Sequence, residues 1–322
     1  VTGINEAGVY VSVNALRTDD KSDHGLPVEL LLRDVLERAH SLDEAIAVAK
    51  EHPVLVPDLY LFADGHSGEA AVIERSPTRF EVVRSKDVIA VANHARTAPF
   101  AGDKANERLR THLTSGARQA RADELLQRFR GSLDASGVQQ ILRDKRGVGD
   151  KELGLGNRNA LDAIIATHSV VVDVTERVIW VAKGPHALGE YIGFDLRREL
   201  GDRSRAEPAS LPEDPTLHTV EYRNFRMMGQ SLHAAEVARQ HGQFNLAIEE
   251  AHRAVGLVPL SADARLVLAD LFFERASKNG TGEEDRRLAR QHYTTFLTLS
   301  PPHRADVEHA ESRLTKLAGS AP

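Results

Sequence analysis

The chain has 322 residues, of which 41% are hydrophobic, with 41 basic against 47 acidic side chains. This balance argues against a nucleic-acid binder, which normally carries a basic face, and no apolar run approaches the roughly 20 residues that span a bilayer. Because there is no cysteine, disulfides, thiolate metal sites and a cysteine nucleophile are excluded within these residues.

The first third of the chain predicts strands arranged around a pair of helices. Residues 1–15 form a hairpin, in which Val9 to Ala15 alternate between a β-branched face and a polar face. Helical periodicity follows over residues 27–40. Ser41 then begins a second helix, and Glu44 completes a capping box.

From Asp58 the pattern returns to short strands. Four runs separated by tight loops predict an antiparallel meander, namely residues 58–64, 69–75, 79–84 and 87–93. Residues 100 to 145 predict helices, and a last hairpin pairs Ile164–Val172 with Val178–Ala182. Runs that are apolar on both faces favour a mostly antiparallel sheet covered on both sides, in an α+β fold.

The C-terminal third is helical and repetitive. Residues 1–200 are the predicted first domain, the proline-rich residues 201–216 a linker, and residues 217–322 a second domain. Small residues and a proline recur at the spacing of a tetratricopeptide repeat, with eight extra residues near "SKNGTGEED". The repeat positions are Gly242, Ala247, Ala251, Ala254 and Pro259, then Ala289, Tyr293, Phe296 and Pro301. An ordinary helical-hairpin bundle is the alternative.

Most motifs of known chemistry are absent. There is no nucleophile elbow, no HExxH and no P-loop lysine, and "RGVGDKELGLGN" predicts a loop rather than a phosphate cradle. The 15 histidines show no ligand spacing, so we expect neither a metal site nor a cofactor. A serine hydrolase would need a triad that cannot be assembled from Ser12, Ser67 or Ser169.

Two polar interruptions remain at the ends of predicted strands. Asn93 and His94 end one strand, and His168 lies within the hairpin that closes the first domain. On the structural interpretation, the Asn93 side chain forms hydrogen bonds to the backbone where the strand ends, and His94 and His168 form hydrogen bonds within the core or a loop. The functional interpretation is that Asn93 aims its amide at a developing oxyanion.

Five segments in order resemble the acyl-coenzyme A:6-aminopenicillanic acid acyltransferase family. They are "TGINEAGVYVSVNAL", "LLLRDVLE" with "SLDEAI", "GEAAVIERSP", "VANH" and "SVVVDVTERVIWVAKGP", and they cover about residues 1 to 198. The resemblance implies a four-layer αββα sandwich of the N-terminal-nucleophile hydrolases. It also implies self-cleavage that exposes a cysteine nucleophile, and hydrolysis or transfer of an acyl group.

The same resemblance assigns site residues. It implies that Asn93 is the oxyanion-hole donor. We expect Asn14, His94 and His168 to line the same pocket as substrate-binding residues, without a catalytic role. Some relatives have an arginine in the strand before the "SVVVD" segment. This chain has no counterpart to it, because Ala163 falls near that position.

The family's cysteine lies upstream of the "GINEAG" hairpin, where this chain starts. We therefore expect a fragment, incomplete at its N-terminus and inactive alone. The expected substrate is a small acyl amide or acyl thioester. The helical domain would bind a peptide or protein, or pack against the catalytic domain. The alternative function is a non-catalytic scaffold that acts through the helical domain.

Overall fold

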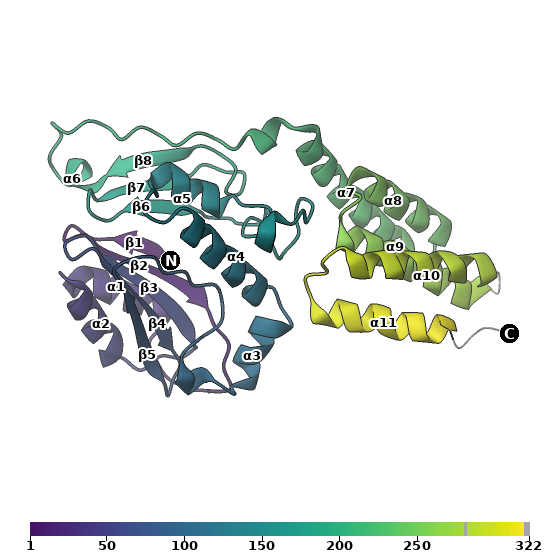
Figure 1. Cartoon of the computed structure of the whole chain (residues 1–322), viewed down its shortest axis with the longest axis horizontal. Helices are drawn as coiled ribbons and strands as arrows, with labels where there is room; N and C mark the ends of the chain where they lie inside the picture. Colours follow the sequence, from purple (N-terminus) through teal and green to yellow (C-terminus); the bar gives the residue numbers. More distant parts are fainter. Residues whose placement is uncertain (280–281, 319–322) are drawn as a thin grey trace. The chain divides into compact units, whose positions relative to one another are not determined.

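The computed structural model describes residues 1–279 and 282–318. It divides into two compact units, one made of Val1–Arg143 with Ala166–Glu213 and one made of Asp144–Ile165 with Asp214–Pro322. The first unit is mixed α/β with antiparallel sheets, and the second is helical (Figure 1). The segment 144–165, which the sequence placed in the first domain, therefore groups with the C-terminal helices.

Five strands of the first unit form one antiparallel sheet in the order of the chain. They are β1 (Thr2–Ile4), β2 (Val9–Ala15), β3 (Asp58–Asp64), β4 (Glu69–Arg75) and β5 (Phe80–Ser85). The predicted hairpin and three strands of the predicted meander are confirmed. The short connections make each strand pair with its successor, as in the register Asp58 to Arg75 between β3 and β4.

Helices α1 (Val28–Arg38) and α2 (Leu42–Glu51) cover one face of this sheet (Figure 1). Ser41 accepts a hydrogen bond from the Glu44 amide at 3.3 Å, as predicted for a cap, while the Glu44 carboxylate accepts from the amide of His40. The core between helices and sheet is aliphatic and aromatic, and includes Val9, Val11, Leu31, Leu32, Val35, Ala45, Tyr60, Phe62 and Ile73.

The opposite face of the sheet is covered by residues 86–103 and by α3 (Lys104–Thr111) and α4 (Ser115–Arg128) (Figure 1). Leu59 of β3 packs there against Phe100 and Leu109. The fourth predicted strand of the meander does not exist, because residues 88–92 form no ladder with any strand in the described part of the chain. Asn93 and His94 consequently do not end a strand, and that expectation was wrong.

A second antiparallel sheet contains β6 (Val170–Asp173), β7 (Val178–Ala182) and β8 (Tyr191–Asp195). The predicted hairpin is present, but its first strand begins at Val170 rather than Ile164. Helix α5 (Ala135–Leu142) packs on β6. The turn between β6 and β7 lies against Gly65, where an added Cβ would come within 2.1 Å of the Val174 carbonyl oxygen.

After the short helix α6 (Leu196–Glu199), the proline-rich segment runs along the second sheet. Trp180 donates its indole N–H to the Ala209 carbonyl at 2.9 Å, and Leu211 pairs with Tyr191 of β8. This part of the predicted linker is therefore bound to the first unit.

Within the described residues, the second unit contains five long helices. They are α7 (Val220–Gln240), α8 (Phe244–Leu257), α9 (Ala262–Asn279), α10 (Gly282–Thr298) and α11 (Arg304–Ala318). Helices α7 and α8 pack as one pair and α9 and α10 as another. The extra residues predicted near "SKNGTGEED" fall partly outside the described residues, since α9 ends at Asn279 and α10 begins at Gly282.

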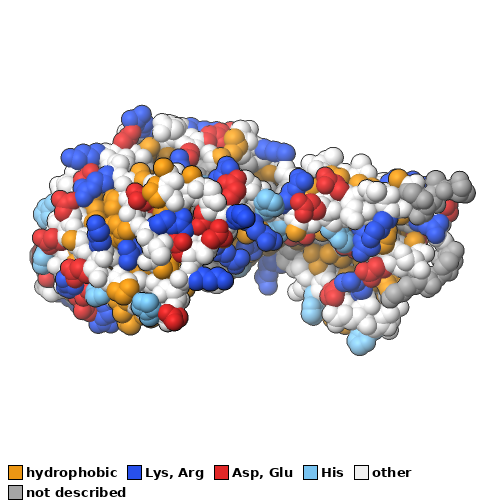
Figure 2. Space-filling view, turned by 90° about the horizontal axis from the view of Figure 1, so that it is seen from below, with side chains coloured by type: hydrophobic (Ala, Val, Ile, Leu, Met, Phe, Trp, Pro, Cys, Tyr) orange, Lys and Arg blue, Asp and Glu red, His pale blue; other side chains and the backbone are white. Residues whose placement is uncertain are grey.

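The surface of the chain mixes both signs of charge. On the face shown in Figure 2, basic and acidic side chains alternate, and hydrophobic side chains lie between them. None of the described helices combines the length and apolar character needed to cross a bilayer.

Candidate active site

Residues 88–92 have no regular secondary structure, and side chains bond to their backbone in place of a neighbouring strand. Gln119 of α4 accepts a hydrogen bond from the Ala92 amide at 2.8 Å and donates one to the Ala90 carbonyl at 3.1 Å. Asn14 of β2 donates to the carbonyls of Val91 at 3.0 Å and Ala92 at 2.8 Å. The backbone of this apolar run is thus satisfied by amide side chains.

Asn93 is held on both sides of its side chain. Its amide nitrogen donates to the Ala15 carbonyl at 2.9 Å, and its Oδ1 accepts from the Arg118 guanidinium at 2.8 Å. Its backbone amide donates to the Ser115 hydroxyl at 2.8 Å. The bond to Ala15 is of the kind that the capping interpretation expects, and it uses one of the two hydrogens on the amide nitrogen.

His94 is buried beside Asn93. Its Nδ1 lies 2.8 Å from the Ser115 hydroxyl, so the two neighbouring residues share one anchor at the start of α4. Burial lowers the pKa of His94, and the nearby charges of Arg96 and Arg110 lower it further. The imidazole is therefore neutral at physiological pH.

The chain after His94 is fixed by two more side chains. Asn106 of α3 accepts from the Ala95 amide at 2.8 Å and donates to the Ala95 carbonyl at 3.0 Å. Glu74 of β4 is only 2% exposed and accepts from the amides of Arg96 and Thr97 at 2.6 and 3.0 Å, and from the Thr97 hydroxyl at 2.5 Å. These bonds make the positions of residues 93–97 rigid.

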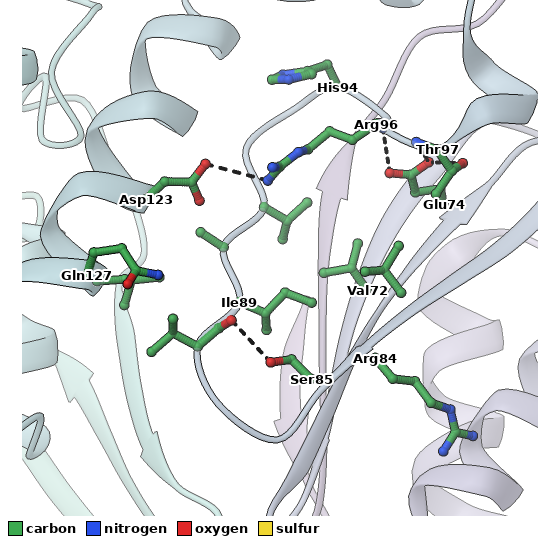
Figure 3. A pocket seen from close by; sticks show the side chains of 15 residues that line it. Val72, Glu74, Arg84, Ser85, Ile89, His94, Arg96, Thr97, Asp123 and Gln127 are labelled. Carbon is green, nitrogen blue, oxygen red and sulfur yellow. Dashed lines mark hydrogen bonds and ion pairs between the residues drawn. The ribbon is translucent and has the colours of Figure 1, made fainter. Parts of the chain in front are cut away.

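A cleft of about 560 Å³ lies between the sheet, residues 88–97 and α4 (Figure 3). Figure 3 shows Ile89 and Val72 facing each other across it, with His94, Arg96, Thr97 and Glu74 at one end. The apolar lining residues are Val72, Val83, Val88, Ile89, Ala90, Val91 and Leu126. The other eight lining residues are polar or charged, namely Glu74, Arg84, Ser85, His94, Arg96, Thr97, Asp123 and Gln127. A cleft of this size that combines an aliphatic wall with placed polar groups is typical of a small-molecule site.

Two charged side chains stand at the polar end of the cleft. The Arg96 guanidinium lies 3.6 Å from the Asp123 carboxylate of α4, and the two side chains are 55% and 44% exposed. An ion pair this open to water is weak. The Arg96 side chain is therefore free to turn toward a ligand.

The structure brings together three of the four residues that the sequence singled out. Asn14 and Asn93 bond to backbone on either side of the junction between β2 and residues 91–93, and His94 lines the cleft. Asn14 and Asn93 are not among the residues that line it. His168 is exposed immediately before β6 and is not among the lining residues either.

The sequence missed the residues that support this site. Ser115 and Gln119 belong to a helix with charged neighbours and carry no local signal. Glu74 did carry one, because it is a charged residue that directly follows the buried apolar run Ala71–Ile73 in the same strand. Ala163 is buried in the segment that groups with the helical unit.

No set of three or more histidine, aspartate or glutamate side chains placed to hold a metal ion is found in residues 1–279 and 282–318.

Comparison with known proteins gives one result on the family. No curated protein matches the chain. The family model described as acyl-coenzyme A:6-aminopenicillanic acid acyl-transferase matches residues 1–184, which contain the five-stranded sheet, the cleft and Asn93. The chain therefore belongs to the acyl-coenzyme A:6-aminopenicillanic acid acyl-transferase family.

Proposed function

We propose that this protein hydrolyses an amide bond or transfers its acyl group, with Asn93 as the oxyanion-hole donor. Family membership supports acyltransferase or hydrolase activity. The observation that supports the role of Asn93 is the fixed geometry of its amide, which bonds to Ala15 on one side and to Arg118 on the other. Preorganised donors of this kind stabilise transition states because they need no reorganisation.

The bond from Arg118 strengthens the donor. A guanidinium that donates to Oδ1 draws electron density from the amide, so the N–H groups of Asn93 become better donors. The second N–H is the one proposed to meet the oxyanion. Neutral His94, on the same anchor, adds no positive charge to the site.

The proposed nucleophile is a cysteine at a newly formed N-terminus, upstream of Val1. Its thiolate would attack the acyl carbonyl, with its own α-amino group as base, and the tetrahedral oxyanion would accept a hydrogen bond from Asn93. Collapse would expel the amine and leave an acyl-enzyme. Water or a second amine would then release the acyl group and restore the thiol. On this proposal the chain without that cysteine is inactive.

We further propose that the first unit forms the four-layer sandwich of this family and that the helices are tetratricopeptide-like. The buried alanines at the predicted repeat positions support the second point, since Ala247, Ala251, Ala254 and Ala289 are all 0% exposed between helices. A peptide or protein partner of these helices stays a prediction, as does the non-catalytic alternative. The non-catalytic alternative would be favoured if the intact protein hydrolysed no amide and removal of its helices abolished its function.

The test is Asn93→Ala in the product of the complete open reading frame, assayed on a panel of acyl amides. We expect kcat to fall at least about tenfold with little change in KM, because the lost bond forms only in the transition state. Asn159→Ala is the control, since Asn159 bonds to the Ser300 carbonyl within the helical unit. Wild-type turnover of a folded Asn93→Ala protein would refute the role of Asn93.

A further inference from the structure

The apolar walls of the cleft are unusually open to water. Val83 is 39% exposed, and each of the consecutive residues Val88 to Val91 is only partly buried. Moving aliphatic side chains out of water lowers the free energy of the system. A concave surface whose aliphatic side chains remain exposed to water is therefore typical of a binding site. At the other end, by contrast, the Glu74 carboxylate accepts hydrogen bonds from the backbone amides of Arg96 and Thr97 and holds that segment in place.

The chemistry of the lining indicates the kind of ligand. All the apolar lining residues are aliphatic, and the aromatic ring among the residues that line the cleft is the imidazole of His94, at the end where Arg96 lies. The aliphatic walls therefore offer dispersion contacts to a chain, and no Phe, Tyr or Trp lines them to stack on a ring. Ile89 and Val72, which face each other in Figure 3, are both part of this aliphatic wall.

The polar end is suited to oxygen atoms of a ligand head group. The backbone of Arg96 is fixed by Glu74, while its guanidinium is half exposed and only loosely paired with Asp123. An arginine in this position can form charge-assisted hydrogen bonds to a carboxylate or carbonyl oxygen. His94 at the same end shares Ser115 with Asn93, so this end of the cleft adjoins the proposed oxyanion donor.

We propose that the cleft binds the aliphatic acyl chain of the substrate, with the oxygen-bearing head group at Arg96. This inference rests on the proposed function and extends it, because it names the acyl class as an open chain rather than an aromatic group. Ile89 determines how much of the chain is accommodated, and Arg96 fixes which end enters.

The experiment measures binding rather than turnover. Straight-chain carboxylates of increasing length are titrated by calorimetry into the product of the complete open reading frame. We expect the affinity to rise roughly fourfold for each added methylene until the cleft is full. An aromatic carboxylate with the same number of carbons should bind more weakly than its straight-chain counterpart.

Two variants test the named residues. Ile89→Trp should remove the gain for long chains while short ones still bind, because the larger side chain fills the cleft. Arg96→Gln should weaken binding about fivefold or more at every length, through the lost charge-assisted bonds. The matched controls are Leu55→Trp and Arg130→Gln, since both positions are exposed and neither lines the cleft. Circular dichroism confirms that each variant is folded.

The outcomes separate the two proposals. Affinity that does not depend on chain length, tighter binding of the aromatic probe, or an Ile89→Trp variant with the wild-type length profile would overturn the acyl-chain assignment. Length-dependent binding together with full turnover in Asn93→Ala would retain the cleft and reject the oxyanion role. Lost turnover in Asn93→Ala, together with no binding of straight-chain carboxylates, would retain the oxyanion role and reject the acyl-chain assignment of the cleft.

Discussion

Amide side chains replace backbone partners around the candidate site. Gln119 and Asn106 each accept from a backbone N–H and donate to a backbone carbonyl, as a neighbouring peptide group would. Such bonds fix a segment without a strand beside it, which leaves its apolar side chains facing the cleft. Asn93 was identifiable from the sequence because an amide after an apolar run is unusual, whereas its partners Ser115 and Arg118 were not.

At a single residue, Asp58 tests how burial of a carboxyl group affects the stability of the fold. It is 6% exposed, its Oδ2 has no hydrogen-bond partner within the described residues, and burial, with the charge of Glu29, raises its pKa to about 7. The unfolded state loses this proton near pH 4. Unfolding is therefore favoured as the pH rises from about 4 to about 7.

We expect Asp58→Asn to raise the free energy of unfolding by about 1–3 kcal/mol at about pH 8 and to change it little at about pH 4. Urea denaturation at both pH values measures this. Glu37→Gln serves as the control, because that carboxylate is exposed. A variant that is less stable than the wild type at the higher pH would show that Asp58 is ionised and paired in the folded protein.

At the scale of elements, three aromatic rings join α8, α9 and α10. His292 stacks on Phe272 at 5.7 Å with an interplanar angle of 3°, and His252 meets both rings edge-on. Burial, together with the charges of Arg265 and His252, lowers the pKa of His292 to about 4. The Nδ1 of His292 lies 3.2 Å from the Arg265 guanidinium, which requires a neutral ring.

This cluster predicts acid sensitivity of the helical unit. Because the folded pKa lies below the unfolded value of about 6.5, the contribution of His292 is present above that pH and is lost as the pH falls toward 4. The loss is on the order of 3 kcal/mol. We expect His292→Phe to reduce this loss of stability at acid pH. His241→Phe is the control, because His241 is exposed, and thermal unfolding at several pH values measures the stability of each variant. An unchanged pH profile in His292→Phe would show that His292 is not the sensor.

The element that the sequence mispredicted was residues 88–92. Its β-branched composition is that of a strand, but a strand exists only where a partner ladder forms. Helical periodicity was more reliable, because a helix satisfies its own backbone. The predicted repeat positions Ala247, Ala251 and Ala254 lie in α8, and Ala289, Tyr293 and Phe296 lie in α10.

At the scale of the whole molecule, the glycine-rich segment 144–165 belongs to the helical unit. Gly156 has φ +84°, and an added Cβ would lie 2.3 Å from the Phe225 ring of α7. Gly154 makes a similar approach to Leu260, and Asn157 bonds to the Ser300 carbonyl. The chain thus leaves the first unit, packs on the helices and returns.

Gly156→Ala should destabilise the helical unit by about 2 kcal/mol or more, from backbone strain and the clash together. Gly149→Ala is the matched control, because Gly149 has φ +66° but an added Cβ meets no atom within 4 Å. It should cost only about 1 kcal/mol. Calorimetric unfolding measures both. Equal losses in the two variants would contradict the packing of this segment on α7.

Periodicity and turn residues, which are local in the chain, were enough to predict the hairpins and the helices. A polar interruption was enough to single out Asn93, although no strand ends there. The sequence by itself also carried the family resemblance over the first part of the chain, which the family match over residues 1–184 confirms. Only the tertiary structure decided that residues 88–92 are held by side chains, that a cleft opens beside them, and that residues 144–165 pack with the helices. Those features depend on contacts between residues far apart in sequence, such as Asn14 with Val91 and Gly156 with Phe225, and no local pattern encodes them.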